Sequence, residues 1–477
     1  MAADTERRFL SSALSAYGSQ LGRVAIRTLA ELALARLILP EDWGVFGLAR
    51  AVLVIAGLVR DAGTQYHLVR DERRPYGEVL VWILTTGSLL TVGLVLAAGL
   101  FAGLDPRLPE VLTWFAPWLL LDGLAIVPKV FFERRLAVRR LVAPEVLRGA
   151  LFATLAITLA ALGWGVWSLV AAELSAAAFF AAFVWRRAWG EIPLGWDPAA
   201  IPPLLRRSSL LFLIALAAVP IPHVQRFVIA AFDESASLAV AFFEKAYEWG
   251  LRLQILVLPA LLRVVYPALV EYRGNRQRMV DAYRLGTVGI LALETLAAYF
   301  LFFNAEVVLL DIILGPKWVA AVPLLKILCF LPLADPFTRL GGEVLKVREE
   351  DRTWLVIVIA NMTSLLVFGV LLARPFGVAG MAWANYLLLG NLLMAWRMAS
   401  FCGPAFWRLL RDLAFVYLLP LPLFLLTAAV FPAASWSRFA ASIAASALVA
   451  AAFLHRFEGP VKDFFFRPSA AAEGDRR

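Results

Sequence analysis

Residues 10–38 read LSSALSAYGSQLGRVAIRTLAELALARLI, and this stretch decides the class of fold. It is long and apolar enough to cross a bilayer as a helix, because about 20 residues span the hydrocarbon core. Gln20, Arg23, Arg27 and Glu31 interrupt it at positions i, i+3, i+7 and i+11. On an α-helix these four side chains fall within roughly 80° of arc. The segment therefore predicts a transmembrane helix that carries one polar stripe.

Two of the stripe residues are arginines near the middle of the span. A charged side chain at that depth costs about 2.5–3.5 kcal/mol on insertion scales, so it is rarely kept without a function. A cationic face inside the membrane indicates that an anionic group passes it.

The composition of the whole chain agrees with a membrane protein. The 477 residues are 61% hydrophobic and 17% charged, and the mean hydropathy is +0.77. A soluble protein of this length could not bury so much apolar surface. We predict an all-α, polytopic membrane protein with about 14 transmembrane helices. The predicted spans are 10–38, 43–68, 77–101, 110–130, 145–163, 165–185, 208–231, 237–262, 285–308, 318–338, 353–373, 377–397, 412–432 and 436–456.

The placement of lysine and arginine tests this count. If the N-terminus is cytoplasmic, the cytoplasmic segments hold 32 of the 45 basic residues and the outer loops hold four. Cytoplasmic loops of membrane proteins carry such an excess. The alternation favours fourteen spans with both termini in the cytoplasm. We expect a multi-pass protein of the inner (plasma) membrane.

A faint internal repeat suggests how the spans are grouped. Gly163-Trp-Gly-Val-Trp-Ser begins the sixth span and Phe376-Gly-Val-Ala-Gly begins the twelfth. Small residues at such places let helices approach closely, although chance recurrence of small residues is the alternative. Two six-span halves are common in transporters. The predicted division is an N-terminal six-helix lobe (1–200), a C-terminal six-helix lobe (201–400), two additional helices (401–466) and a disordered tail (467–477).

Five arginines lie at depth in spans 1, 2, 7 and 8. Glu31, Glu244 and Glu248 are the obvious carboxylates that could pair with them. Arginine suits phosphate, because its planar fork binds two oxygens and keeps its charge. We therefore predict a water-filled cavity between the lobes that accepts a phosphate-like group. The predicted substrate-binding residues are Arg23, Arg27, Arg50, Arg226 and Arg252.

The other charges in these spans have a second predicted role. Glu31, Glu244, Lys245 and Glu248 are candidates for ion coupling or for pairing with the arginines. The alternative is that buried charges hold helices together or snorkel to the interface. We favour that alternative for charges near span ends, which are Arg36, Arg60, Asp61, Asp122, Lys326 and Asp335.

Several classes of site are not expected. Cys329 and Cys402 lie far apart in the sequence and the three histidines are scattered, which indicates neither a disulfide framework nor a metal site. We find no phosphate-binding glycine-rich loop and predict no catalytic residues, no cofactor and no nucleic-acid partner.

Four segments resemble the Wzx-type polysaccharide flippases of the multidrug/oligosaccharidyl-lipid/polysaccharide exporter superfamily. They are Arg36-Leu-Ile-Leu-Pro-Glu-Asp-Trp-Gly, Leu58-Val-Arg-Asp-Ala-Gly with Leu68-Val-Arg, Leu314-Gly-Pro-Lys-Trp-Val-Ala-Ala-Val-Pro-Leu-Leu-Lys-Ile-Leu, and Phe376-Gly-Val-Ala-Gly-Met-Ala-Trp-Ala-Asn. The resemblance implies two six-helix lobes, two additional C-terminal spans and alternating access. The chain departs from the family at Arg226 and at Ala241-Phe-Phe243, where relatives often carry a carboxylate and Gly-x-Tyr.

The resemblance also implies a function. Such flippases move an oligosaccharide on a polyprenyl pyrophosphate from the cytoplasmic to the outer leaflet, for cell-surface polysaccharide biosynthesis. The implied partners are the lipid-linked oligosaccharide, membrane lipids, glycosyltransferases and a polysaccharide polymerase. Two alternatives stay open: a cation-coupled drug or metabolite antiporter of the same superfamily, and a membrane-embedded glycan ligase or polymerase. The basic stripe disfavours the first, and the lack of a large outer loop disfavours the second.

Overall fold

The computed structural model of the protein describes residues 22, 25–65, 68, 75–135, 137, 139–233, 235–431 and 434–466. Over these residues it contains helices, turns and short connections but no strand, which confirms the predicted all-α class. The contacts divide the chain into two compact units, Met1–Glu244 (unit 1) and Lys245–Arg477 (unit 2). The border falls within helix α12 (Ala236–Gly250). The predicted lobe borders at residues 200 and 400 remain a prediction.

The described helices confirm a multi-pass membrane protein. Ten of them are long and apolar enough to cross a membrane, and an eleventh is added if the bent pair Phe212–Ala218 and Ile221–Phe232 forms one span. One of the ten, Asp351–Cys402, has 52 residues and is broken at Gly377, where the backbone is not helical. It covers two of the predicted spans. The full count of fourteen remains a prediction, because the first span lies partly outside the described residues.

Unit 1 consists of a helix at residues 25–37 followed by helices that pack around α2. They are α2 (Pro40–Asp61), α4 (Tyr76–Ala97) with η1 (Ala98–Phe101), α5 (Leu108–Phe115), α6 (Trp118–Leu124), α7 (Ile126–Arg134), α8 (Arg139–Ala161), α9 (Val166–Ala188), η2 (Pro198–Ala200), α10 (Ile201–Ala218) and α11 (Ile221–Phe232). Helices α4, α5, α6, α9, α10 and α11 all contact α2. The apolar side chains of α4, α7 and α9 form a core with Phe131 and Phe132 at its centre.

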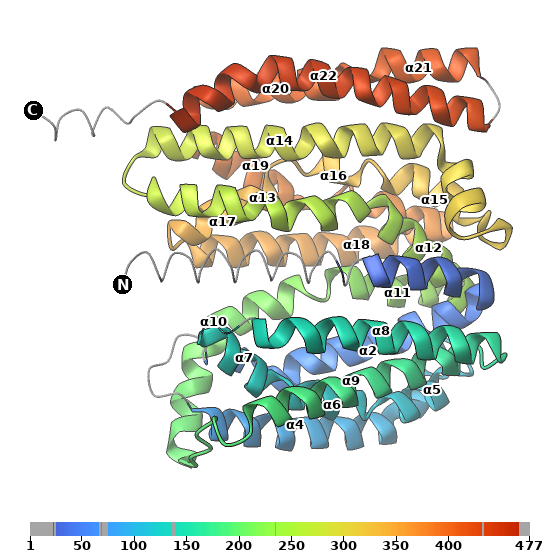
Figure 1. The fold of residues 1–477 in the computed structure, drawn as a ribbon, viewed down its shortest axis with the longest axis vertical. Coiled ribbons are helices and arrows are strands. Elements are labelled where there is room, and N and C mark those ends of the chain that lie inside the picture. The colour runs from blue at the N-terminus through green and yellow to red at the C-terminus, as the bar shows by residue number, and fades with distance from the viewer. Residues whose placement is uncertain are drawn as a thin grey trace, which may run out of the picture. The chain divides into compact units, whose positions relative to one another are not determined.

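Helices α8 and α9 lie side by side as a hairpin (Figure 1). Their turn contains Gly163 and Gly165, whose φ angles are +82° and +52°. Glycine takes positive φ without a steric penalty, so two glycines allow a very short connection. Gly377, at the corresponding place of the predicted repeat, has φ +54° and ψ −137°, close to the +52° and −128° of Gly165. The two proposed repeat starts thus share a backbone conformation.

The loops predicted to face outward meet at one end of unit 1. Arg107 Nη1 donates to Asp42 Oδ1 at 2.9 Å, and its backbone N–H donates to Asp105 Oδ1 at 2.8 Å. Burial alone would raise the pKa of Asp105, but hydrogen bonds from Arg107 and the Ser237 hydroxyl outweigh it and lower the pKa. These residues belong to two predicted outer loops and the start of α12, so the contacts agree with the loop assignment.

The opposite loops of unit 1, predicted to be cytoplasmic, are also joined by charged contacts. Glu191 accepts hydrogen bonds from Arg135 at 3.1 Å and from Arg140 at 2.7 Å. Arg187 donates to the backbone oxygen of Arg140 at 2.8 Å. The basic residues that set the predicted topology therefore hold neighbouring loops together.

Unit 2 is built around α14, which contacts α13, α20, α21 and α22. Its elements are α13 (Arg252–Glu271), α14 (Arg276–Phe303), η3 (Val307–Ile313), η4 (Pro316–Trp318), α15 (Ala321–Leu328), α16 (Leu331–Ala334), α17 (Thr338–Val347), α18 (Asp351–Ala384), α19 (Leu389–Cys402), α20 (Ala405–Leu418), α21 (Pro420–Val430) and α22 (Trp436–Phe466). Figure 1 shows α20, α21 and α22 along one side of α14.

A salt bridge joins two predicted cytoplasmic loops of unit 2. Arg397 donates to both oxygens of Glu350, with nitrogen–oxygen distances of 2.6–3.0 Å, and Arg348 donates to Oε1 at 2.7 Å. Burial opposes ionisation of Glu350, but the two guanidinium groups outweigh it and lower its pKa. The carboxylate therefore stays charged and the bridge persists at neutral pH.

Candidate functional site

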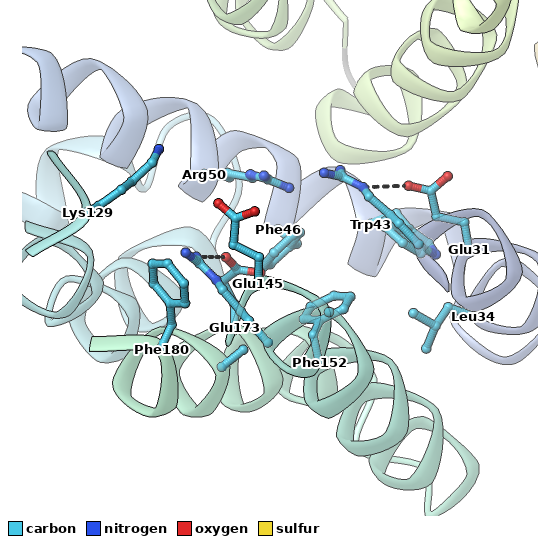
Figure 2. Close-up of a pocket in the computed structure, with 14 residues that line it drawn as sticks. Glu31, Leu34, Trp43, Phe46, Arg50, Lys129, Glu145, Phe152, Glu173 and Phe180 are labelled. Carbon is cyan, nitrogen blue, oxygen red and sulfur yellow. Dashed lines mark hydrogen bonds and ion pairs between the residues drawn. The ribbon is translucent and has the colours of Figure 1, made fainter. Parts of the chain in front are cut away.

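A cavity of about 420 Å³ lies within unit 1 and is lined by the first helix and by α2, α7, α8 and α9 (Figure 2). Three of these helices present one face each, because their lining residues follow the helical spacing of three and four. The lining residues are Trp43, Phe46 and Arg50 on α2; Glu145, Arg148, Gly149 and Phe152 on α8; and Glu173, Ala176 and Phe180 on α9. Each face combines charged and aromatic side chains.

Most of the charges that line the cavity are paired. Arg27 Nε lies 3.0 Å from Glu31 Oε1, one helical turn further along. Arg148 Nη2 donates to Glu173 Oε1 at 3.3 Å, and its Nη1 lies 3.8 Å from Asp122 Oδ1. These pairs satisfy the carboxylates with arginine, which lowers the cost of placing both charges at depth.

Arg50 is the exception among these cations. It is partly exposed to the cavity, and within the described part of the chain it makes no hydrogen bond or ion pair. Arg27, Glu173, Arg226 and Glu244 act on it electrostatically from a distance. A guanidinium held in this way offers its planar fork to an anion that enters the cavity.

Arg226, on α11, is held by three groups of unit 1. Its Nη2 donates to Glu244 Oε1 at 2.7 Å and its Nη1 donates to the backbone oxygen of Gly47 at 3.1 Å. The same Nη1 lies 3.0 Å from His223 Nδ1. Glu244 in turn packs against Gly47, where an added Cβ would lie 2.3 Å from its Oε2. Arg226 and Glu244 thus fasten α11 and α12 to α2.

The remaining predicted residues of α12 and α13 lie in unit 2. Glu248 accepts from Arg252 at 2.9 Å and from Lys245 at 3.4 Å. The Arg252 guanidinium also lies over the Trp249 ring, 4.9 Å from its centroid. Lys245 is buried, with 3% exposure. This cluster is a shared ion pair along one helical face.

The structure therefore brings together some of the predicted site residues. Arg27, Arg50 and Glu31 share the cavity, and each of Glu31, Glu244 and Glu248 pairs with a predicted arginine. Arg23 lies outside the described residues. The roles of all nine residues in substrate binding or ion coupling remain predictions.

Four lining charges do not belong to the predicted site: Lys129, Glu145, Arg148 and Glu173. The spacing of Glu145, Arg148 and Phe152 at i, i+3 and i+7 is the signal that could have indicated them. The positive-inside count assigned Lys129 and Arg148 to a cytoplasmic loop instead.

Five of the charges that we assigned to structural roles make polar contacts, four of them as ion pairs. Arg60, 2% exposed, lies 2.7 Å from Asp61 and 3.4 Å from Asp122. Lys326 lies 2.6 Å from Glu306. Asp335 accepts the backbone N–H of Thr338 at 3.1 Å, at the start of α17.

No curated protein matches the chain, but solved structures share its fold. One is the lipid II flippase MurJ in an inward closed conformation, with a TM-score of 0.75 and 12% identity, covering 94% of this chain and 99% of that chain. Another is an inward-facing multidrug resistance MATE family transporter of the MOP superfamily, with a TM-score of 0.60 and 17% identity, covering 81% and 99%.

A MOP superfamily transporter from Pyrococcus furiosus, described as having a binding pocket of reversed polarity, is a third. Its TM-score is 0.56 at 15% identity, with 82% of this chain and 96% of that chain covered. Because the sequence identities are this low, these likenesses establish the fold alone.

The family comparison covers more than half of the sequence. Residues 33–323 match the family described as polysaccharide biosynthesis protein, which confirms the resemblance read from the four motifs. The motif before α2 and the cavity faces of α2, α8 and α9 fall within this range, whereas Arg27 and Glu31 of the first helix lie before it. The chain therefore belongs to the polysaccharide biosynthesis protein family.

Proposed function

We propose that the protein is a flippase that moves a polyprenyl-pyrophosphate-linked oligosaccharide from the cytoplasmic to the outer leaflet by alternating access. The family match and the likeness to transporters of this fold support this proposal. The observation that carries it is Arg50, a guanidinium that faces a cavity without a protein counter-ion among the described residues. A cation kept at this cost indicates an anionic ligand.

In this proposal the pyrophosphate binds first to Arg50. Arg27, whose side chain is 55% exposed, is the next cation of the same cavity. In the sequence Arg23 precedes Arg27 by four positions, and we include it in the proposed set. Arg226 and Arg252 remain proposed contacts of the substrate, and each is held by a carboxylate in its own unit. The lipid tail stays in the bilayer while the head group crosses.

The membrane potential can supply the driving force. Moving an anion outward from a cell whose interior is at negative potential is downhill by about 2.3 kcal/mol per charge per 100 mV. A pyrophosphate diester carries about two charges, so its export gains several kcal/mol without ATP. Proton or sodium coupling through Glu31, Glu244, Lys245 or Glu248 is the competing source of energy.

The proposal places the protein in the inner membrane, next to the enzymes that build and extend the glycan. Glycosyltransferases supply the lipid-linked oligosaccharide at the cytoplasmic face, and a polymerase uses it at the outer face. The protein itself carries out transport and no bond-making step. Glycosyl transfer by the purified protein would contradict this assignment.

The test is a flipping assay in vesicles with a fluorescent lipid-linked oligosaccharide and a membrane-impermeant quencher. Arg50→Ala should lower the rate about ten- to a hundredfold, since a charge-assisted hydrogen bond is lost. Arg50→Lys should give an intermediate rate, because lysine keeps the charge but not the fork. An imposed membrane potential should change the rate at which the unmodified protein flips the lipid.

The matched control is Arg186→Ala, which removes an exposed arginine at the end of α9. It should flip the lipid at the normal rate. Full activity of Arg50→Ala, or of the double variant Arg23→Ala/Arg27→Ala, would show that these cations do not bind the substrate.

A further inference from the structure

The aromatic side chains of the cavity are not explained by binding of a pyrophosphate. A pyrophosphate needs cations and donors, yet Trp43, Phe46, Phe152 and Phe180 line the same space as Arg50. A site for the lipid tail would instead be apolar throughout. Each of α2, α8 and α9 places an aromatic ring within two turns of a charged group. The ligand therefore has to offer both apolar faces and polar edges.

Two of the four rings are buried. Phe46, with 5% exposure, stacks on Phe115 at a centroid distance of 5.5 Å. Phe180, with 4% exposure, lies under the Arg148 guanidinium at 5.3 Å. Trp43 and Phe152 are partly exposed and lie on different helices. These two rings are the ones that a ligand can reach.

The space beside these rings is kept open by small residues. Gly149 precedes Phe152 by one turn, and among the described residues a Cβ added there would come within 4 Å of Ile26 Cγ2 alone, at 3.9 Å. Ala176, on α9, is a second small residue that lines this space. Figure 2 shows Arg50 and Glu145 directed into the same space from α2 and α8. A volume of about 420 Å³ exceeds what a pyrophosphate alone would fill and matches sites for small organic ligands.

We infer that this cavity is a sugar-binding subsite, which holds the sugar rings next to the pyrophosphate. A sugar ring presents C–H groups on its faces and hydroxyl groups around its edge. The C–H faces stack on Trp43 and Phe152, and the hydroxyls donate to carboxylates such as Glu145, beside the phosphate bound by Arg50. This inference rests on the proposed function and adds that unit 1 binds the glycan as well as the pyrophosphate.

The test compares two lipids in the same vesicle assay and in direct binding to the purified protein. One is undecaprenyl pyrophosphate that carries a disaccharide, and the other is undecaprenyl pyrophosphate without sugar. Trp43→Leu and Phe152→Leu should bind and flip the glycosylated lipid about three- to tenfold less well, the range of one aromatic contact. Both variants should handle the sugar-free lipid normally.

Controls separate this effect from damage to the fold. Trp164→Leu removes a tryptophan that is 53% exposed in the α8–α9 turn, and it should leave both lipids unaffected. Trp43→Phe and Phe152→Tyr keep an aromatic surface for stacking, so these variants should still distinguish the glycosylated lipid from the sugar-free lipid. If a leucine variant fails to fold, Gly149→Leu replaces it, because it fills the open space and improves helix propensity. Gly149→Leu should reduce handling of the glycosylated lipid preferentially.

The outcomes distinguish this inference from the proposed function. Arg50→Ala should impair both lipids, whereas the aromatic variants impair only the glycosylated one. If Arg50→Ala impairs both and the aromatic variants affect neither or both equally, the sugar subsite is wrong and the flippase proposal stands. If Arg50→Ala impairs neither lipid, the proposed function fails first.

Discussion

Arg60 is a single residue on which the packing of unit 1 depends. Its side chain is 2% exposed and lies beside Asp61 and Asp122, and Nη1 donates to the backbone oxygen of Leu119. Removing it leaves the partly buried Asp61 without its cation and leaves Asp122 with only Arg148, 3.8 Å away, which costs about 1–3 kcal/mol. Arg60→Ala should therefore lower the unfolding temperature in detergent.

The surface variant Arg186→Ala is the control for Arg60, since it also removes one arginine but from an exposed site. Its unfolding temperature should stay within about a degree of the unmodified protein, because surface substitutions of this kind change stability by less than about 0.5 kcal/mol. Equal unfolding temperatures for both variants would mean that the Arg60 cluster contributes nothing to stability.

Charged residues also show which contacts can be read from a sequence. The pairs Arg27–Glu31 and Glu248–Arg252 are four residues apart, and helical periodicity alone places them together. Arg226 and Glu244 pair although they lie on two different helices, and Arg148 pairs with Glu173 across the α8–α9 hairpin. Such pairs depend on helix packing, which a hydrophobicity profile does not encode. For that reason the sequence alone left Arg226 without an assigned partner, whereas the structure pairs it with Glu244.

At the scale of one element, the turn between α8 and α9 depends on Gly165. Its φ of +52° and ψ of −128° are open only to glycine, and an added Cβ would lie 2.6 Å from Asp42 Oδ2. Gly165→Ala should destabilise the protein by about 1–3 kcal/mol and lower its unfolding temperature.

Gly93→Ala is the matched control, because Gly93 lies inside α4 and nothing stands within 4 Å of an added Cβ. Alanine favours a helix interior by up to about 1 kcal/mol, so this variant should be as stable as the unmodified protein or more stable. A Gly165→Ala variant of equal stability would show that the turn can relax into an ordinary backbone.

Helix breaks mark the limit of prediction at the same scale. The predicted span 110–130 is three helices, α5, α6 and α7, and 318–338 covers α15, α16 and the start of α17. Pro117 and Pro332 lie at two of these breaks, where proline removes a backbone donor. The sequence shows the prolines, but whether a span bends or only kinks depends on its neighbours.

For the molecule as a whole, the pattern of charged loops was the most informative property of the sequence. The length of the apolar segments predicted the transmembrane helices. The excess of basic residues predicted which loops lie on the same side of the membrane. The contacts of Arg107 with Asp42 and of Arg140 with Glu191 join loops in the predicted sets. The cavity within unit 1 could not be predicted in the same way, because it needs the first helix, α2, α7, α8 and α9 to meet.

The direction of transport depends on the orientation of the whole molecule, and cysteine labelling can measure it. Cys329 and Cys402 are buried and free, so alanine at both gives a background without reactive thiols. Leu162→Cys, at a side chain 69% exposed, marks the predicted outer turn between α8 and α9, and Trp189→Cys, at 81%, marks the predicted cytoplasmic end of α9. A membrane-impermeant maleimide added to intact cells should label the first and not the second.

The same measurement in unit 2 makes the orientation test independent of unit 1. Phe376→Cys, 64% exposed, lies in a predicted outer turn, and Ser400→Cys is exposed near the predicted cytoplasmic end of α19. We expect Phe376→Cys to react in intact cells and Ser400→Cys only after permeabilisation. Labelling of the opposite pair would invert the topology, and a pyrophosphate moving outward would then enter from the wrong end of the cavity. Agreement of both units would fix the cytoplasmic face from which the substrate is taken.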